Sequence, residues 1–294
     1  MNAITLLDGG MGQELVTRSG DAPTPLWSTQ VMIDHPGLVA QIHGDYFAAG
    51  ATIATANTYA LHRDRLIRAG IEDRMATLHA DALSEAAQAR DAHGSGRIAG
   101  AIGPLGASYR TDLHPDDARA TALFAEIAGL LAPSCDLLIF ETVASLAQVR
   151  SAMSVPCDIP VWLALTVDDC DGTRFRSGEP LADVLPHVAG ASALLINCSA
   201  PEAMPAALET IARAGLPYGA YANAFTGITA DFLRDDSTVD ALSPRRDLGP
   251  EAYADHVMGW VGQGATIVGG CCETGPAHIA AIARRLIAAG HQIV

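Results

Sequence analysis

Cysteine residues follow two apolar runs of the sequence, at positions where they could hold a metal ion. Cys198 ends the run ALLINC, and the adjacent residues Cys271 and Cys272 follow TIVGG within VGGCCETGP. Consecutive side chains of an extended strand point to opposite faces, so both sulfurs of the pair reach one target only where the strand bends. The flanking glycines permit such a bend. Three thiolates favour zinc and leave a fourth position open, as catalytic zinc sites do.

The residue types alone leave other roles for these cysteines open. The adjacent pair also fits a vicinal disulfide or simple packing. The other cysteines are less informative: Cys135 and Cys157 lie at the edges of apolar runs, as buried thiols often do, and Cys170 lies in the acidic segment DDCDGT. Six cysteines at irregular spacing do not indicate a disulfide framework. We therefore assign a role only to the three cysteines that follow the two runs.

Two carboxylates also end apolar runs. Asp8 ends ITLLD and precedes Gly9 and Gly10, and Glu141 ends CDLLIFE. A carboxylate accepts hydrogen bonds from an ammonium group, and glycine N–H groups can donate to a carboxylate, so the Asp8 segment fits the two ends of an amino acid. A helix cap or a turn-forming residue is the structural alternative for Asp8, and a buried ion pair with a basic residue is the alternative for Glu141.

The elements that must position these residues are short apolar runs, of which the chain has eight. Nearly continuous apolar runs are typical of parallel strands that are covered on both faces. Longer stretches with helical spacing of apolar residues lie between them, for example at 36–50, 74–94, 201–215 and 276–290. The eight runs span residues 4–8, 52–57, 97–103, 135–141, 161–166, 193–198, 218–223 and 266–271.

This alternation of strands and helices predicts an α/β protein with a single (β/α)8 TIM barrel over residues 1–294. An open doubly wound sheet is less well supported, because no GxGxxG turn follows the first strand. In a (β/α)8 barrel the active site lies at the carboxyl ends of the strands, which is where the cysteines and carboxylates stand. We therefore expect their side chains to meet at one mouth of the barrel.

Charge and hydropathy limit the possible partners. The 294 residues carry a net charge of −15, which would repel nucleic acid and anionic lipid. No segment approaches the roughly 20 apolar residues of a membrane span, and the first residues, MNAITLLDGG, lack the pattern of a signal peptide. We expect a soluble cytoplasmic protein that acts on small molecules, without a nucleic-acid or membrane partner.

Eight segments of the chain resemble segments of the homocysteine S-methyltransferase family, in the same order and across residues 4–290. They are LLDGGMGQEL, PLWS with the following HP, DYFAAGA, TANTY, ETVAS, INCS, YANA and GGCCETGP. The most specific element is GGCC together with the upstream NC. The resemblance implies a catalytic zinc ion on Cys198, Cys271 and Cys272, with the thiolate of homocysteine in the fourth position.

The resemblance also implies roles in homocysteine binding. Asp8 and Glu141 would hold the amino group of homocysteine, and the amides of Gly9 and Gly10 would receive its carboxylate. Asn223, which follows the seventh predicted strand, would lie near the zinc ion when substrate is absent. These five residues and the three cysteines make up the predicted site.

The implied reaction is direct methyl transfer from a sulfonium or ammonium donor to homocysteine, which gives methionine. The compact length and the PLWS segment favour S-methylmethionine or S-adenosylmethionine as the donor. Betaine or dimethylsulfoniopropionate-type donors and other small thiol acceptors are alternatives. An alternative of another class is a zinc- or thiol-binding barrel without turnover, such as a redox sensor built on the adjacent cysteines. A zinc hydrolase is disfavoured, because no HxH follows the first strand.

Aromatic side chains and one histidine are candidates for the donor pocket. A positively charged donor suits aromatic faces, and Trp27, Tyr59, Tyr109 and Tyr221 stand at or near predicted strand ends. Betaine-using members of the family place a tyrosine near the zinc ion where this chain has ALHRDR. His62 therefore either takes that place or lies at the surface where a helix begins.

Overall fold

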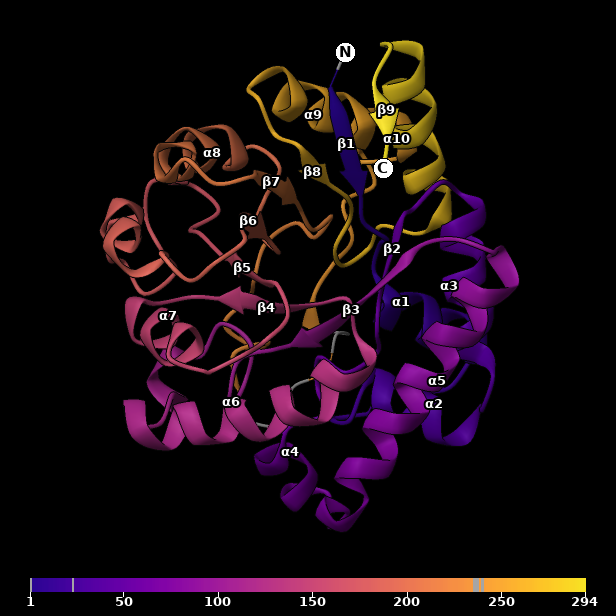
Figure 1. Ribbon diagram of the computed structural model, residues 1–294, viewed down its shortest axis with the longest axis vertical. Coiled ribbons are helices and arrows are strands. Elements are labelled where there is room, and N and C mark those ends of the chain that lie inside the picture. Colours follow the sequence, from indigo (N-terminus) through magenta and orange to yellow (C-terminus); the bar gives the residue numbers. More distant parts are fainter. Residues whose placement is uncertain (1, 23, 235–237, 239–240) are drawn as a thin grey trace.

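The structure, a computed structural model, describes residues 2–22, 24–234, 238 and 241–294. Within these residues, nine parallel strands form one sheet in the order β2-β3-β4-β5-β6-β7-β8-β1-β9. Leu7, which follows β1, bridges to Ile53 of β2 and so closes the first eight strands into a barrel, and Figure 1 shows the ring of strands with helices around it. The strands are β1 (Ala3–Leu6), β2 (Ile53–Thr55), β3 (Arg97–Ile102), β4 (Leu137–Val143), β5 (Val161–Leu165), β6 (Ala193–Asn197), β7 (Tyr218–Tyr221), β8 (Ile267–Val268) and β9 (Gln292–Ile293).

All eight predicted strands are present, and the predicted (β/α)8 barrel is confirmed. The strand β9 is an addition that the sequence did not predict, because two residues are too few to show a period. It pairs with β1 through Ala3 and Gln292, on the opposite side of β1 from β8. This pairing places the C-terminal strand beside β1 (Figure 1).

Helices cover the outside of the barrel. The connection between β5 and β6 departs from the expected alternation, because it holds only a 3-10 helix, η4 (Leu181–His187), which contains Pro186. A proline inside an α-helix removes a backbone donor and clashes with the preceding turn. None of the described helices has the length and apolar character needed to cross a membrane. The α-helices are α1 (Met11–Ser19), α2 (Ser28–Asp34), α3 (Leu38–Ala48), α4 (Arg63–Arg68), α5 (Met75–His93), α6 (Asp117–Leu131), α7 (Leu146–Met153), α8 (Met204–Ile211), α9 (Pro250–Gly262) and α10 (Pro276–Ala288).

The hydrophobic core has two main parts, because the strands bury both of their faces. The larger part lies between the strands and the surrounding helices. The smaller part fills the barrel interior, and Cys271 packs directly against it. This smaller part of the core therefore lies directly beneath the polar residues at the strand ends. Its members are Leu7, Ile53, Ala99, Leu137, Ile139, Trp162, Ala164, Ala193, Leu195, Tyr221 and Ile267.

Candidate active site

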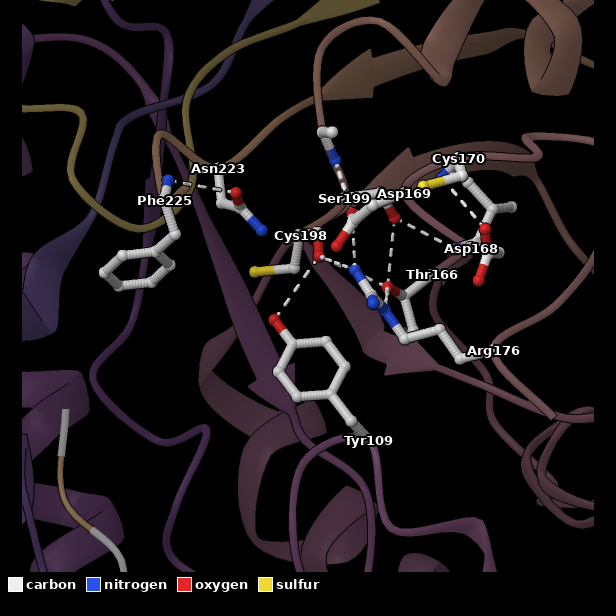
Figure 2. Close-up of polar contacts among 12 residues, drawn as sticks. Tyr109, Thr166, Asp168, Asp169, Cys170, Arg176, Cys198, Ser199, Asn223 and Phe225 are labelled. Carbon is white, nitrogen blue, oxygen red and sulfur yellow. Dashed lines mark hydrogen bonds and ion pairs between the residues drawn. The ribbon is translucent and has the colours of Figure 1, made fainter. Parts of the chain in front are cut away.

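A pocket of about 520 Å³ opens at the carboxyl ends of the barrel strands. Seven of the eight predicted site residues line it, and the exception is Asn223. The side chain of Asn223 is buried next to Cys198 (Figure 2), where its Oδ1 accepts a hydrogen bond of 3.2 Å from the Phe225 amide. The barrel therefore brings the predicted residues to one mouth. The seven lining residues are Asp8, Gly9, Gly10, Glu141, Cys198, Cys271 and Cys272.

The three predicted cysteines form one cluster. Their sulfur atoms all lie within 4.8 Å of one another, which is close enough to surround a single metal ion. Cys198 and Cys271 are joined in a disulfide, and the sulfur of Cys272 lies 3.9 Å from each of the other two. The alternative of a vicinal disulfide is therefore wrong, because the bond links β6 to β8. Burial raises the pKa of the Cys272 thiol to about 12, so this thiol stays protonated at neutral pH unless a cation is present.

Close packing explains the glycines that precede the cysteine pair. A Cβ atom on Gly269 would lie 2.6 Å from the Leu7 side chain, and one on Gly270 would lie 2.0 Å from Thr274 Oγ1. Neither glycine has a positive φ, whereas Glu273 just after the pair has a φ of +63°. The bend that the sequence suggested therefore has two causes. Gly269 and Gly270 let the chain pass close to Leu7 and to Thr274, and Glu273 turns the chain after the cysteine pair.

Cys198 has a strained backbone that three side chains support. Its φ is +47°, which is uncommon for any residue other than glycine. Its carbonyl oxygen accepts hydrogen bonds of 3.3 Å from Tyr109 Oη, Thr166 Oγ1 and Arg176 Nη2 (Figure 2). Arg176 is itself held by Asp169 at 2.7 Å. This carbonyl clamp stabilises the conformation that directs the Cys198 sulfur toward the other two. Thr166 and Arg176 come from the segment after β5 and Tyr109 comes from the loop after β3, all distant in sequence from Cys198, so no local pattern in the sequence reveals the clamp.

The two carboxylates have neutral partners. Asp8 accepts hydrogen bonds of 2.7 Å from both the amide and the hydroxyl of Thr55, and Glu141 accepts one of 2.7 Å from the Tyr221 hydroxyl. The helix-cap role for Asp8 and the ion pair for Glu141 are therefore wrong. The residue that caps α1 is Gly10, which makes no side-chain bond, and the observed partner of Glu141 is a hydroxyl group and not a basic residue.

Burial dominates the electrostatics of this pair. It raises the pKa of Asp8 to about 7 and the pKa of Glu141 to about 7, and the charge of Glu141 adds to the shift of Asp8. His43 Nδ1 lies 3.8 Å from Asp8, but burial lowers the pKa of His43 to about 3, so the imidazole is neutral and offers no charge. A buried and a half-buried carboxylate with no charged cation beside them among the described residues are suited to receive an ammonium group.

The two glycines after Asp8 differ in what they can offer a ligand. The Gly10 amide donates a hydrogen bond of 2.8 Å to the Thr274 carbonyl, so it is already engaged. A Cβ atom on Gly9 would lie 2.2 Å from that same carbonyl oxygen and 2.9 Å from the Tyr46 ring. Glycine is therefore required at position 9 by close packing. The predicted binding of a substrate carboxylate by Gly10 would require its amide to leave Thr274.

All four candidate aromatic residues, Trp27, Tyr59, Tyr109 and Tyr221, line the pocket. Trp27 and Tyr59 meet edge to face, with ring centroids 6.5 Å apart. Two further aromatic residues that sequence reasoning missed, Phe225 and Phe232, also line the pocket. They lie in the long loop after β7, where no period distinguishes a pocket residue from any other.

His62 does not belong to the pocket, and it is not a surface residue. It is fully buried at the N-terminal end of α4, and its Nε2 lies 3.1 Å from the Tyr59 carbonyl oxygen. Tyr59 is the residue of this segment that lines the pocket. Both roles considered for His62 are therefore wrong, because the chain turns inward between Tyr59 and the start of α4.

Glu141→Gln is expected to stabilise the protein at pH 8. Glu141 has a raised pKa when folded, so between about pH 4.5 and 7 the folded state holds a proton that the unfolded state has lost. The wild type therefore loses stability as the pH rises through this window. Glutamine removes the loss and can still accept the Tyr221 bond, so we expect a gain of about 1–3 kcal/mol at pH 8 and almost none at pH 4.

Urea unfolding of the two proteins across this pH range would measure the difference. Glu209→Gln, on the exposed side of α8, is the matched control and should show no such trend. A gain that is the same at pH 4 and pH 8 would contradict the assignment of a buried, protonated Glu141.

A (β/α)8 barrel with a cysteine cluster and two carboxylates at its mouth defines a class of protein whose sulfur atoms could hold a metal ion. Residues 5–286 match the family model of homocysteine S-methyltransferase, and the chain belongs to this family. It is therefore a methyltransferase that acts on homocysteine with a methyl donor. The resemblance found in the sequence is confirmed.

Relatives and solved structures match over nearly the whole chain. Homocysteine S-methyltransferase of Escherichia coli K12 is 30% identical, with 96% of this chain and 95% of that protein covered. The Bacillus subtilis protein YbgG, a homocysteine S-methyltransferase, is 27% identical, with 95% and 93% covered. The metallated form of E. coli MmuM, a homocysteine methyltransferase, superposes with a TM-score of 0.81 at 29% identity, covering 97% of this chain and 96% of that one. Its oxidized form gives 0.80 at 28% identity, covering 96% of each chain.

Proposed function

We propose that this homocysteine S-methyltransferase is a single-domain, zinc-dependent enzyme that takes its methyl group from a sulfonium donor, S-methylmethionine or S-adenosylmethionine. The observation that carries the proposal is the convergence of three cysteine sulfurs from β6 and β8 on one point. Three soft sulfur ligands fit zinc and leave one position for an incoming thiol. The existence of a metallated form of E. coli MmuM supports the binding of a metal by this related chain.

The disulfide between Cys198 and Cys271 must be reduced before both residues can serve as ligands. Reduced thiols persist in the cytoplasm, so we propose a cytoplasmic location for the active enzyme. Zinc, when bound, would keep the homocysteine sulfur deprotonated at neutral pH while leaving it nucleophilic. The carbonyl clamp on Cys198 would hold that ligand in place.

The chain's own residues would orient both substrates. Asp8 and Glu141, when ionised, would bind the ammonium group of homocysteine, and so fix the direction in which its sulfur points. The aromatic rings that line the pocket would receive the positively charged donor by cation–π attraction. The donor becomes neutral as it loses the methyl group, so this attraction weakens and the product can leave.

A donor panel with homocysteine tests the proposal. The protein is reduced, loaded with zinc and assayed with S-methylmethionine, S-adenosylmethionine, betaine and dimethylsulfoniopropionate, and methionine is measured by mass spectrometry alongside metal content. We expect methionine from a sulfonium donor and about one zinc ion per chain. Transfer by the metal-free protein at the same rate, or from betaine alone, would refute the proposal. Membership in an enzyme family favours turnover over a barrel that only binds zinc.

Tyr109→Phe is expected to weaken zinc binding by about 3- to 10-fold, because one neutral hydrogen bond contributes about 0.5–1.5 kcal/mol. The substitution removes the bond to the Cys198 carbonyl but keeps the ring beneath Arg176, whose Cζ lies 4.7 Å from the ring centroid. Zinc competition with a chromophoric chelator would measure the change. Tyr218→Phe is the control, since its hydroxyl bonds to the Gln263 carbonyl, away from the pocket. Equal zinc affinity in all three proteins would argue against the clamp.

A further inference from the structure

Charged residues divide the pocket into two parts. The two carboxylates, Asp8 and Glu141, stand at the strand ends with the cysteines. Among the described residues, the other charged side chains that line the pocket are arginines, although the chain has a net charge of −15. They come from α4 and from the loops after β3 and β7. These arginines are Arg65, Arg68, Arg110 and Arg234.

Three of these four arginines have a carboxylate nearby. The nitrogen–oxygen distances are 3.9 Å from Arg68 to Asp64, 2.8 Å from Arg110 to Asp112 and 3.1 Å from Arg234 to Asp231. The two residues of each pair are close in the sequence, and at least one side chain of each pair is half-exposed or more. These contacts are therefore mainly surface ion pairs. Arg65 differs from these three arginines in the partners of its guanidinium group.

The Arg65 guanidinium lies against the pocket without a carboxylate partner among the described residues. Its Nη2 donates a bond of 3.1 Å to the Pro104 carbonyl, and its Nε is buried with no hydrogen-bond partner. The adjacent carboxylate of Asp64 is engaged by backbone amides, those of Arg65 itself at 2.9 Å and Gly106 at 2.8 Å. Arg65 is half-buried and lines the pocket, and a charge held partly away from water without a counter-charge is costly, so this arrangement fits an anion that binds from the pocket.

The surroundings of Arg65 indicate which anion is missing. Its Cζ lies 5.8 Å from the centroid of the Tyr59 ring, and that ring meets Trp27 edge to face. A guanidinium group beside aromatic rings presents a carboxylate-binding fork next to a surface that attracts onium cations. A molecule with an onium centre at one end and a carboxylate at the other matches both features.

We infer that Arg65 binds the carboxylate of the methyl donor. This inference rests on the proposed function, and it specifies the donor class as an onium compound that carries a free carboxylate. S-Methylmethionine, S-adenosylmethionine, dimethylsulfoniopropionate and betaine share that chemistry, and the donor panel distinguishes them. With the carboxylate on Arg65 and the onium group against Tyr59 and Trp27, the donor is anchored at its far end while its methyl group is directed to the cysteine mouth.

The test pairs a change in the donor with a change in the protein. Arg65→Gln and wild type, both loaded with zinc, are assayed with the sulfonium donor that the wild type uses best and with the amide of that donor. We expect Arg65→Gln to lower kcat/KM by about 10- to 100-fold for the carboxylate donor, as for the loss of a charge-assisted bond, and to leave the amide donor within about 3-fold. The KM for homocysteine should not change.

Two further variants separate recognition from folding. Arg65→Lys keeps the charge without the planar fork, so it should recover part of the lost kcat/KM with the carboxylate donor. Arg63→Gln removes another arginine of α4, which pairs with Glu126 and does not line the pocket, and it should stay within about 3-fold of wild type with either donor. Both variants should unfold at nearly the wild-type temperature.

Equal losses with the carboxylate and amide donors would overturn the inference, since Arg65 would then only support the fold. A raised KM for homocysteine with an unchanged KM for the donor would also overturn it, because the anion would belong to the acceptor. If the wild type transferred a methyl group from no donor, the proposed function would fail. Calorimetric titration of S-methylmethionine into wild type and Arg65→Gln would still test the inference in that case. A weaker affinity of Arg65→Gln would support binding of the carboxylate by Arg65, and an unchanged affinity would overturn it.

Discussion

Cys272→Ala is expected to remove the bound zinc ion and to lower methyl transfer to homocysteine by at least about a thousandfold, or about 4 kcal/mol. Cys272 is the one member of the cluster outside the disulfide, and its sulfur lies 3.9 Å from both of the others. Without Cys272 only two thiolates remain, one fewer than the three protein ligands of a catalytic zinc site. The fold should survive, because alanine is tolerated in the half-buried turn after β8.

Metal content after dialysis, methionine formation and the unfolding temperature would be measured on the same preparation. Cys170→Ala is the matched control, because this thiol is exposed in the loop after β5 and does not line the pocket. Retention of one equivalent of zinc by Cys272→Ala, with activity lost, would show that Cys272 acts in some way other than as a ligand. Loss of zinc with full activity would refute zinc dependence itself.

Glu141→Gln is expected to keep the zinc ion and to raise the KM for homocysteine by about 10- to 100-fold, the worth of one charge-assisted hydrogen bond. Glutamine can still accept the Tyr221 bond, so the local structure is preserved. The wild-type KM should rise as the pH falls from 8 to 6, because both buried carboxylates have a pKa of about 7 and only the ionised forms attract the ammonium group.

The pH dependence distinguishes this role from a structural one. In Glu141→Gln only Asp8 still titrates, so the rise in KM between pH 8 and pH 6 should be shallower than in wild type. Asp8→Asn should also weaken homocysteine binding and leave the zinc ion in place, although asparagine must turn an amide N–H₂ toward one of the Thr55 donors. Metal loss in either variant would contradict the assignment. Together with the expected gain in stability at pH 8, Glu141→Gln would show that the buried carboxylate is kept for binding at a cost to the fold.

The sequence by itself determined the architecture and the residue types at its mouth. Parallel strands that are buried on both faces must be nearly continuous apolar runs, so the eight strands are visible without a structure. A closed barrel places all carboxyl ends of its strands at one mouth, so the polar residues that end these runs had to meet. Cys198, Cys271, Cys272, Asp8 and Glu141 were found in this way.

Only the tertiary structure decided the partners of these residues. The bond between Thr55 and Asp8, the bond between Tyr221 and Glu141, and the carbonyl clamp on Cys198 join elements that lie far apart in the sequence. The bond of Arg65 to the Pro104 carbonyl and its place beside the Tyr59 ring also depend on such contacts. Side chains from separate loops share no period, and their meeting depends on loop paths that strand and helix patterns do not specify. The periodic part of the chain was therefore readable from the sequence, and the aperiodic loops that complete the site required the folded protein.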